Sequence, residues 1–99
     1  MAWAIDWSES ALADLEAIVA YIARDNQTAA ERVGESLIVA VEQASVFPEM
    51  GRIVPEKRTS GVRELVVAPS RIFYLPVPAR ERIVVTHVWH AARGNPPLS

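Results

Sequence analysis

Hydrophobic and polar positions repeat with two different periods along the chain. Trp3, Ile5 and Trp7 alternate with other residues at the start, and a period of two predicts a short half-buried strand. The next apolar positions recur at steps of three and four, which predicts an amphipathic helix. They are Leu12, Leu15, Ile18, Val19 and Ile22. A second stripe with the same spacing predicts a second helix. It runs through Val33, Leu37, Val41 and Ala44.

Residues typical of helix ends flank both stripes. Ser8 stands where the first helix needs an N-cap. Thr28 and Glu31 have capping-box spacing, which predicts that Thr28 caps the second helix. Pro48 and Gly51 are expected to end that helix. Because only a short turn separates the two helices, they should form an antiparallel hairpin.

The second half of the chain is rich in strand-forming residues. Short turns divide it into one possible edge strand and three longer strands. The first is assigned to an edge because Pro55 has no backbone N–H to donate to a neighbouring strand. These segments are residues 52–55, 62–67, 71–77 and 83–90. Short links between consecutive strands favour an antiparallel meander. The order β-α-α-β-β-β(-β) therefore predicts an α+β domain, in which the helical hairpin packs on an antiparallel sheet.

Composition indicates one globular domain over residues 1–99, with 51% apolar and 22% charged residues. The chain has no cysteine and two histidines, so a disulfide is excluded, a structural zinc site is not expected, and we expect no cofactor. Acidic residues interrupt the N-terminal segment, unlike a signal peptide, and no stretch approaches the roughly 20 apolar residues of a membrane span. We expect a cytoplasmic protein with no membrane partner.

Charge is divided unevenly between the two halves. Residues 1–50 hold nine acidic and two basic residues, whereas residues 51–99 hold eight basic and three acidic ones. Such asymmetry favours an anionic partner for the second half, although solvated helices are often acidic for no functional reason.

The order of elements and a series of short motifs resemble the RelE/ParE superfamily of toxins. The motifs span residues 3–93 in the expected order. They are Trp7-Ser8, Ala11, Asp14-Leu15, Ile18, Tyr21-Ile22-Ala23, Asp25-Asn26, Ala29-Ala30, Phe47-Pro48, Gly51-Arg52, Arg63-Glu64-Leu65, Arg71-Ile72, Tyr74, His90 and Arg93.

This resemblance implies a toxin that a cognate antitoxin neutralises, in a complex that binds operator DNA only through the antitoxin. In the RelE branch the toxin cleaves messenger RNA at the ribosome, and in the ParE branch it poisons DNA gyrase. A third alternative is a non-toxic partner that serves only in autorepression. Fold alone does not choose among these functions.

The resemblance also suggests site residues for the ribonuclease alternative. Arg63 matches an arginine near the scissile phosphate, Arg71 would add a second cation, His90 would transfer a proton, and Arg93 would support transition-state charge. Basic residues that would hold the nucleic acid or another target are Arg52, Lys57 and Arg58.

Each of these residues also has a structural interpretation. Arg63 could extend along the sheet or pair with a helix carboxylate, and His90 could be a plain surface residue at a strand end. His87 shares the alternating face of Ile83, Val85 and Trp89, which predicts a packing role. The tryptophans are expected in the core or at a partner contact.

Two features favour the gyrase alternative over the ribonuclease. The chain has a net charge of −2 and a single lysine, and phosphate binding weakens as neutralising cations are lost. The ending His90-Ala91-Ala92-Arg93 also resembles the His-x-x-Arg ending of the ParE branch. The sequence therefore predicts growth inhibition through DNA gyrase, with the ribosome and its messenger RNA as the alternative target.

Overall fold

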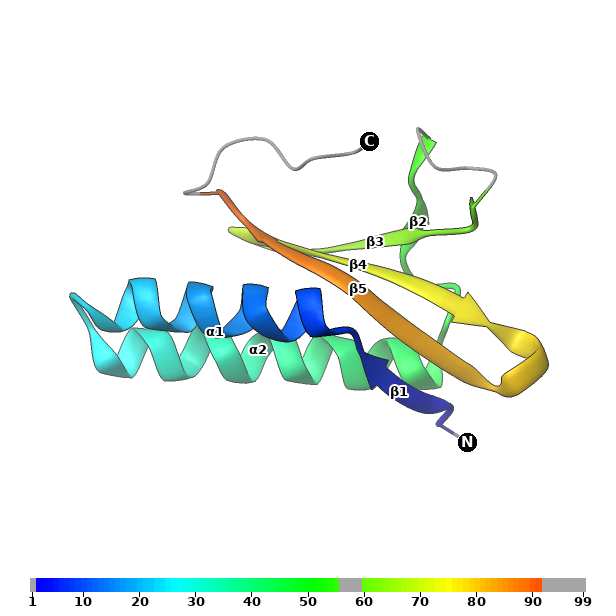
Figure 1. The fold of residues 1–99 in the computed structure, drawn as a ribbon, viewed down its shortest axis with the longest axis horizontal. Coiled ribbons are helices and arrows are strands. Elements are labelled where there is room, and N and C mark those ends of the chain that lie inside the picture. The colour runs from blue at the N-terminus through cyan, green and yellow to red at the C-terminus, as the bar shows by residue number, and fades with distance from the viewer. Residues whose placement is uncertain (1, 56–59, 92–99) are drawn as a thin grey trace.

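In the part of the chain that this computed structural model describes, residues 2–55 and 60–91, two α-helices pack on one face of a five-stranded sheet (Figure 1). The elements in chain order are β1 (Ala4–Trp7), α1 (Glu9–Ala23), α2 (Gln27–Val46), β2 (Arg52–Ile53), β3 (Arg63–Val67), β4 (Ser70–Val77), the short 3-10 helix η2 (Pro78–Arg80) and β5 (Arg82–His90). The predicted α+β fold, with a helical hairpin on the sheet, is confirmed.

The helices begin at side-chain caps, one of which the sequence placed wrongly. Ser8 accepts a hydrogen bond from the Ala11 N–H at 3.0 Å and caps α1, as predicted. Asn26, not Thr28, caps α2, because its Oδ1 accepts from the Ala29 N–H at 3.0 Å. The capping box at Thr28 is therefore wrong, since Thr28 already lies inside the helix.

The sheet has the order β1-β5-β4-β3-β2. Strands β2 to β5 form the predicted antiparallel meander. Strand β1 lies beside β5 in parallel, with Ile5 opposite Ile83 and Trp7 opposite Val85. After β1, the hairpin of α1 and α2 carries the chain to the opposite edge of the sheet, where the meander begins with β2. The last strand of the meander, β5, then lies beside β1 and runs parallel to it.

A β-bulge in β5 changes which of its side chains face the helices. Tyr74 pairs with Val85 but Phe73 pairs with His87, so Thr86 is the extra residue. His87 consequently points to the face of the sheet away from the helices, called the outer face below, and its side chain is 58% exposed. The prediction that His87 packs beside Ile83 was wrong, because strict alternation fails at a bulge.

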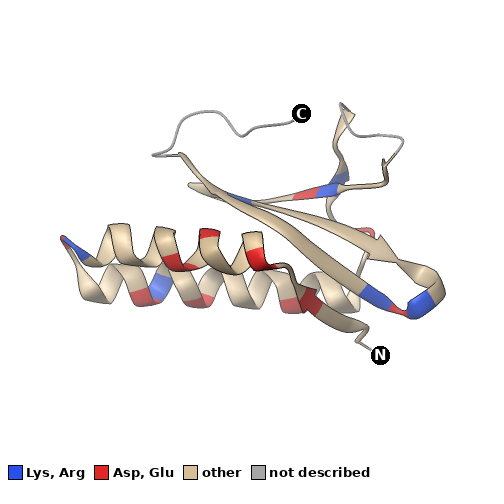
Figure 2. Cartoon of the chain, viewed as in Figure 1, with Lys and Arg blue, Asp and Glu red and all other residues tan. Residues whose placement is uncertain are grey.

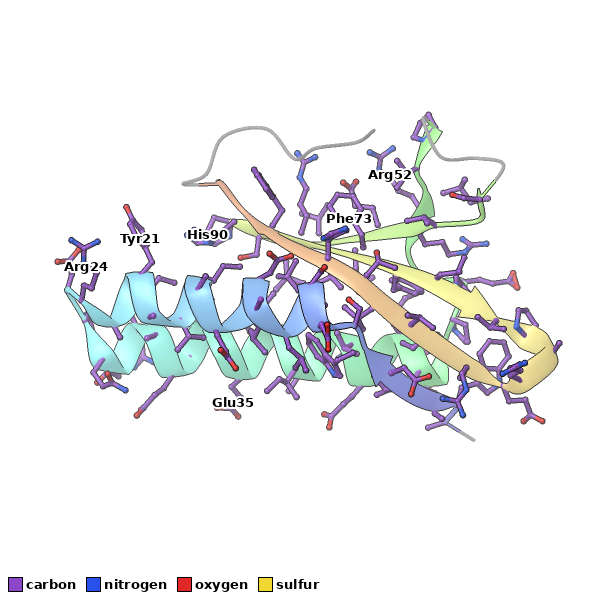
Figure 3. The ribbon with its side chains drawn as sticks, in the orientation of Figure 1. Tyr21, Arg24, Glu35, Arg52, Phe73 and His90 are labelled. Carbon is purple, nitrogen blue, oxygen red and sulfur yellow. The ribbon has the colours of Figure 1, made fainter. Side chains whose placement is uncertain are left out.

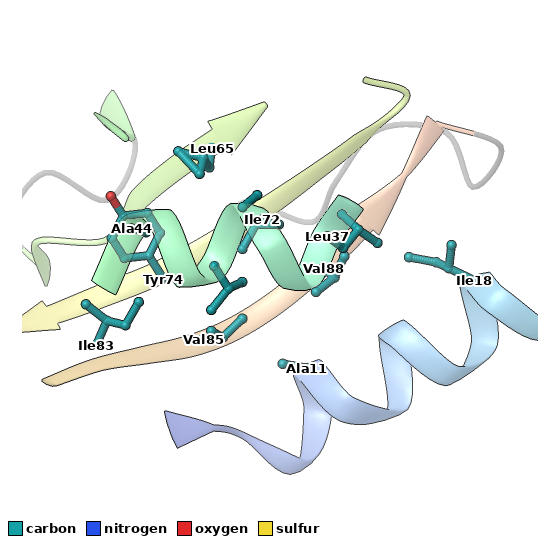
Figure 4. Close-up of a cluster of buried hydrophobic side chains, with 12 residues drawn as sticks. Ala11, Ile18, Leu37, Ala44, Leu65, Ile72, Tyr74, Ile83, Val85 and Val88 are labelled. Atoms are coloured by element: carbon teal, nitrogen blue, oxygen red, sulfur yellow. The ribbon is translucent and has the colours of Figure 1, made fainter. Parts of the chain in front are cut away.

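The core lies between the sheet and the hairpin (Figure 4). Leu37 of α2 is fully buried there, and burial of such a side chain stabilises the fold by about 1.5–3 kcal/mol. Other members come from both helices and three strands: Ala11, Ile18, Ala40, Val41, Ala44, Leu65, Ile72, Tyr74, Ile83, Val85 and Val88. The partly buried Trp3 and Trp7 pack against this cluster, in line with the prediction. No helix among the described residues is long and apolar enough to cross a membrane.

Candidate functional site

Three charged residues form a cluster on the outer face of the sheet. Glu64 of β3 is almost completely buried, with its side chain 2% exposed, and it pairs with two half-exposed arginines. Arg52 Nε lies 2.7 Å from Glu64 Oε1, and Arg71 Nη1 lies 3.3 Å from Glu64 Oε2. The carboxylate thus fixes cations from β2 and β4 side by side. Because each guanidinium has five N–H donors, the arginines keep donors for an anionic partner.

The surroundings of this cluster combine aromatic and basic side chains. Phe73 pairs with both Glu64 and His87, and Trp89 pairs with Arg71, so all of them share the outer face. No helix covers this face in the described part of the chain, as Figure 1 shows. Charge differs between the layers: acidic residues predominate on α1 and α2, and arginines on the sheet (Figure 2). The outer face is therefore suited to an acidic partner segment.

Arg63 has a different environment from the outer-face arginines. It pairs with Tyr74 in the β3–β4 register, so it points to the helix face. Its Nη1 donates to the carbonyl oxygens of Gly51 at 2.7 Å and Glu49 at 3.2 Å. Arg63 thus holds the turn that follows α2 through that turn's backbone. This structural role differs from both expected ones, which were extension of the side chain along the sheet and pairing with a helix carboxylate.

Tyr74 holds the same turn from β4. Its hydroxyl donates to the Pro48 carbonyl at 2.8 Å and accepts from the Gly51 N–H at 2.9 Å. Burial raises the pKa of Tyr74 above 10.0, while the Gly51 hydrogen bond and the nearby Arg63 charge oppose that rise. Gly51 is required here, because a Cβ would lie 2.7 Å from the Tyr74 hydroxyl and 2.9 Å from the Glu64 carbonyl oxygen.

His90 lies at the end of β5, on the helix side of the sheet (Figure 3). It is buried, and its Nδ1 lies 3.0 Å from the Ser70 Oγ. The hydroxyl can donate to or accept from that nitrogen, depending on the tautomer. A plain surface position for His90 is therefore wrong, and the Ser70 bond joins the ends of β4 and β5.

Asp14 of α1 satisfies the backbone of β5 just beyond the bulge. Its Oδ2 accepts from the Val88 N–H at 3.0 Å and lies 3.5 Å from His87 Nδ1. Ser8 Oγ donates to the Thr86 carbonyl at 3.0 Å. Since β1 pairs only with residues 82–85, the Ser8 and Asp14 side chains bond two backbone groups of β5 that lie beyond the end of that pairing.

The structure brings together only some of the residues that the sequence suggested. Arg52 and Arg71 meet at Glu64, but Arg63 and His90 point to the other face of the sheet. Their β4 register partners are four residues apart, which is about 13 Å along a strand. Lys57, Arg58 and Arg93 lie outside the described residues. Within those residues, no group of three His, Asp or Glu side chains could hold a metal ion.

Sequence reasoning gave no role to four residues that organise these surfaces, although three of them fall within the motifs that resemble the toxin superfamily. Glu64, Tyr74, Ser70 and Asp14 all anchor a neighbouring element through a side chain. Glu64 offered one signal, because it is a single acidic residue between strand-forming neighbours in a basic half of the chain. For the other three, the sequence alone did not indicate that the side chain anchors a neighbouring element.

Comparison with known proteins identifies similar chains. Residues 5–94 match the family model described as the ParE toxin of the type II toxin-antitoxin system parDE. Toxin RelE2 of Caulobacter vibrioides is 37% identical over 87 residues, which cover 88% of this chain and 93% of the relative.

Two solved structures share the fold. One is the RelBE2 toxin-antitoxin complex of Mycobacterium tuberculosis, with a TM-score of 0.70, 15% identity and coverage of 91% of this chain and 99% of that one. The other is the chromosomal ParDE toxin-antitoxin system of P. aeruginosa, with a TM-score of 0.69, 22% identity and coverage of 89% and 95%.

Proposed function

Because the chain belongs to the ParE toxin family of type II toxin-antitoxin systems, we propose that it arrests growth through DNA gyrase until its cognate antitoxin binds. The protein is a toxin of such a system, and its partner is the cognate antitoxin. The proposal concerns its target.

The separation of Arg71 from Arg63 and His90 is the observation that supports gyrase over messenger RNA. Phosphodiester cleavage requires a proton-transfer group and cations around one phosphate. Arg71 points to the outer face, whereas Arg63 and His90 point to the helix face, opposite Tyr74 near the middle of β4 and Ser70 at its start. Arg63 is also bound to two backbone carbonyls, and His90 to Ser70. A toxin that acts by binding a protein target does not need these groups to converge.

Charge supports an acidic antitoxin segment on the outer face. Arg52 and Arg71 remain about half exposed after pairing with Glu64, and no other carboxylate lies in the strand segments β2–β5. We therefore place the antitoxin contact across β2, β3 and β4, where its carboxylates would meet both arginines.

Mapping messenger RNA 5′ ends after induction of the chain without its antitoxin tests the proposal. We expect growth arrest and a DNA-damage response without new cuts inside translated codons. Co-expression of the antitoxin is the control, and it should remove both effects. In-frame cuts that disappear in Arg71→Ala would instead establish the ribonuclease alternative.

The ribonuclease remains the second candidate because the 37% identical relative carries the name RelE2. The third alternative, a non-toxic partner in autorepression, predicts unchanged growth in the same experiment. Each alternative thus gives a different combination of growth and RNA cleavage.

A further inference from the structure

One face of α2 points away from the core and alternates between acidic and apolar side chains. Glu35, Val39, Glu42 and Val46 are spaced four, three and four residues apart, so they lie on one face of the helix. Buried Leu37, Val41 and Ala44 each follow one of these residues by two positions, which is about 200° around the helix axis. All four exposed residues thus face away from the sheet, as labelled Glu35 does in Figure 3.

Exposed apolar residues continue beyond the helix into the turn. Phe47 is 65% exposed and Met50 is 47% exposed, and the Met50 N–H donates to the Phe47 carbonyl at 2.9 Å. We call the set Glu35, Val39, Glu42, Val46, Phe47, Glu49 and Met50 the α2 surface. Within the described residues, it holds four of the nine exposed large hydrophobic side chains, a concentration that is typical of an interaction surface.

The turn that carries Phe47 and Met50 is held in place by side chains of β3 and β4. Tyr74 binds the backbone of Pro48 and Gly51, and Arg63 binds the backbone of Glu49 and Gly51. These contacts use backbone groups and leave the apolar side chains pointing outwards. A surface fixed before binding loses less conformational entropy when a partner docks, so this anchoring favours binding.

The charge of the α2 surface is entirely negative. Glu35, Glu42 and Glu49 are exposed, and residues 33–51 contain no lysine or arginine. An acidic antitoxin segment would therefore be repelled here, although it suits the outer face. A second copy of this chain offers no basic α-helix among its described residues, because α1 and α2 each have more acidic than basic residues.

From the apolar stripe, its acidic flanks and its anchored turn, we propose that the α2 surface docks a basic amphipathic helix of a protein partner. Lysine or arginine side chains of that helix would pair with the three glutamates, and its apolar side chains would cover Val39, Val46 and Phe47. Helix-on-helix packing suits the four-three-four spacing of α2. The inference does not depend on whether gyrase is the target, since it concerns only the chemistry of this surface.

Peptide binding to the full antitoxin-free chain tests the inference. The probe is a fluorescent synthetic peptide in which leucine and lysine repeat at helical spacing, and its control has glutamate in place of lysine. In anisotropy titrations we expect only the basic peptide to bind, and increasing salt to weaken it. The double variant Glu35→Lys/Glu42→Lys and the variant Phe47→Ser should each weaken binding by about tenfold or more.

Matched variants elsewhere provide the controls. Glu16→Lys changes an exposed acid of α1, and Val66→Ser changes an exposed apolar residue of the outer face, so both should bind the peptide normally. Circular dichroism melts verify that every variant is folded. Equal binding by the α2-surface variants, preference for the acidic peptide, or a dimer of this chain that these variants abolish would each overturn the inference.

Discussion

Arg71 and His90 lie one position apart in the β4–β5 register, and their side chains point to opposite faces of the sheet. Trp89 is the partner of Arg71, and Ser70 is the partner of His90. The two residues therefore belong to different surfaces, one basic and covered by no helix among the described residues, and the other packed against the helical layer. This division is why we assign the outer face to the antitoxin and do not assign a cleavage centre to the pair.

Replacing Glu64 should destabilise the chain measurably. Glu64→Gln removes the charge that binds Arg52 and Arg71, although both arginines can regain water because they are about half exposed. We expect a loss of about 1–3 kcal/mol in the free energy of unfolding, measured by urea titration. Asp6→Asn is the matched control, because Asp6 pairs with Arg82 at the surface and should cost under about 1 kcal/mol. Equal losses would contradict the importance of the buried carboxylate.

Tyr74 should make stability depend on alkaline pH. Its pKa in the folded chain is raised above 10.0 by burial, so above that pH the folded state holds more protons than the unfolded state. The contribution is full below pH 10, and it is lost as pH rises towards and through the folded pKa. The free energy of unfolding should therefore fall more steeply above pH 10 in the native chain than in Tyr74→Phe.

Urea titrations between neutral and strongly alkaline pH measure this difference. Tyr74→Phe itself should cost about 1–3 kcal/mol at neutral pH, because the buried Gly51 N–H loses its acceptor. Tyr21→Phe is the control, since Tyr21 is exposed. Parallel curves for the native chain and Tyr74→Phe would show that the buried hydroxyl does not couple to folding.

The two candidate caps of α2 should differ in their effect on stability. Asn26→Ala removes the acceptor for the Ala29 N–H and should cost about 1 kcal/mol in thermal or urea unfolding. Thr28→Ala changes an exposed residue inside the first turn and should cost little. A larger loss for Thr28→Ala would restore the capping box that the sequence suggested.

The two glycines at close contacts should respond differently to alanine. At Gly51 the new Cβ would lie under 3.0 Å from Tyr74 and from the Glu64 backbone, so Gly51→Ala should cost about 1–3 kcal/mol. At Gly34 it would lie 3.3 Å from the Val19 side chain, and the better helix propensity of alanine offsets that tight contact. Gly34→Ala should therefore be close to neutral in the same unfolding assay. Similar losses at both positions would contradict the anchored turn.

The sequence predicted the larger elements because their signals are local and repeated. The helical stripe through Ile18 and Ile22 and the strand-forming runs after Gly61 were each sufficient to place an element. The parallel pairing of β1 with β5 was not predictable in this way. Alternation at Trp3, Ile5 and Trp7 shows that one face is buried, but it does not identify the neighbouring strand.

The positions of the candidate site residues depended on features that a single sequence does not reveal. One extra residue at Thr86 moved His87 to the outer face and His90 to the helix face. Similarly, Arg63 and Glu64 are adjacent in sequence but serve opposite faces, and only the register with Tyr74 and Phe73 distinguishes them. Residue type indicated the basic character of the sheet, while register determined which arginines meet.

Adding the purified chain to a supercoiling assay with purified DNA gyrase tests whether gyrase is the target of this toxin. We expect loss of supercoiling or accumulation of cleaved DNA, with full reversal by the cognate antitoxin. Arg71→Ala should retain inhibition while binding the antitoxin more weakly. If gyrase supercoils DNA normally in the presence of the chain, and the chain cleaves messenger RNA on ribosomes, gyrase is not its target.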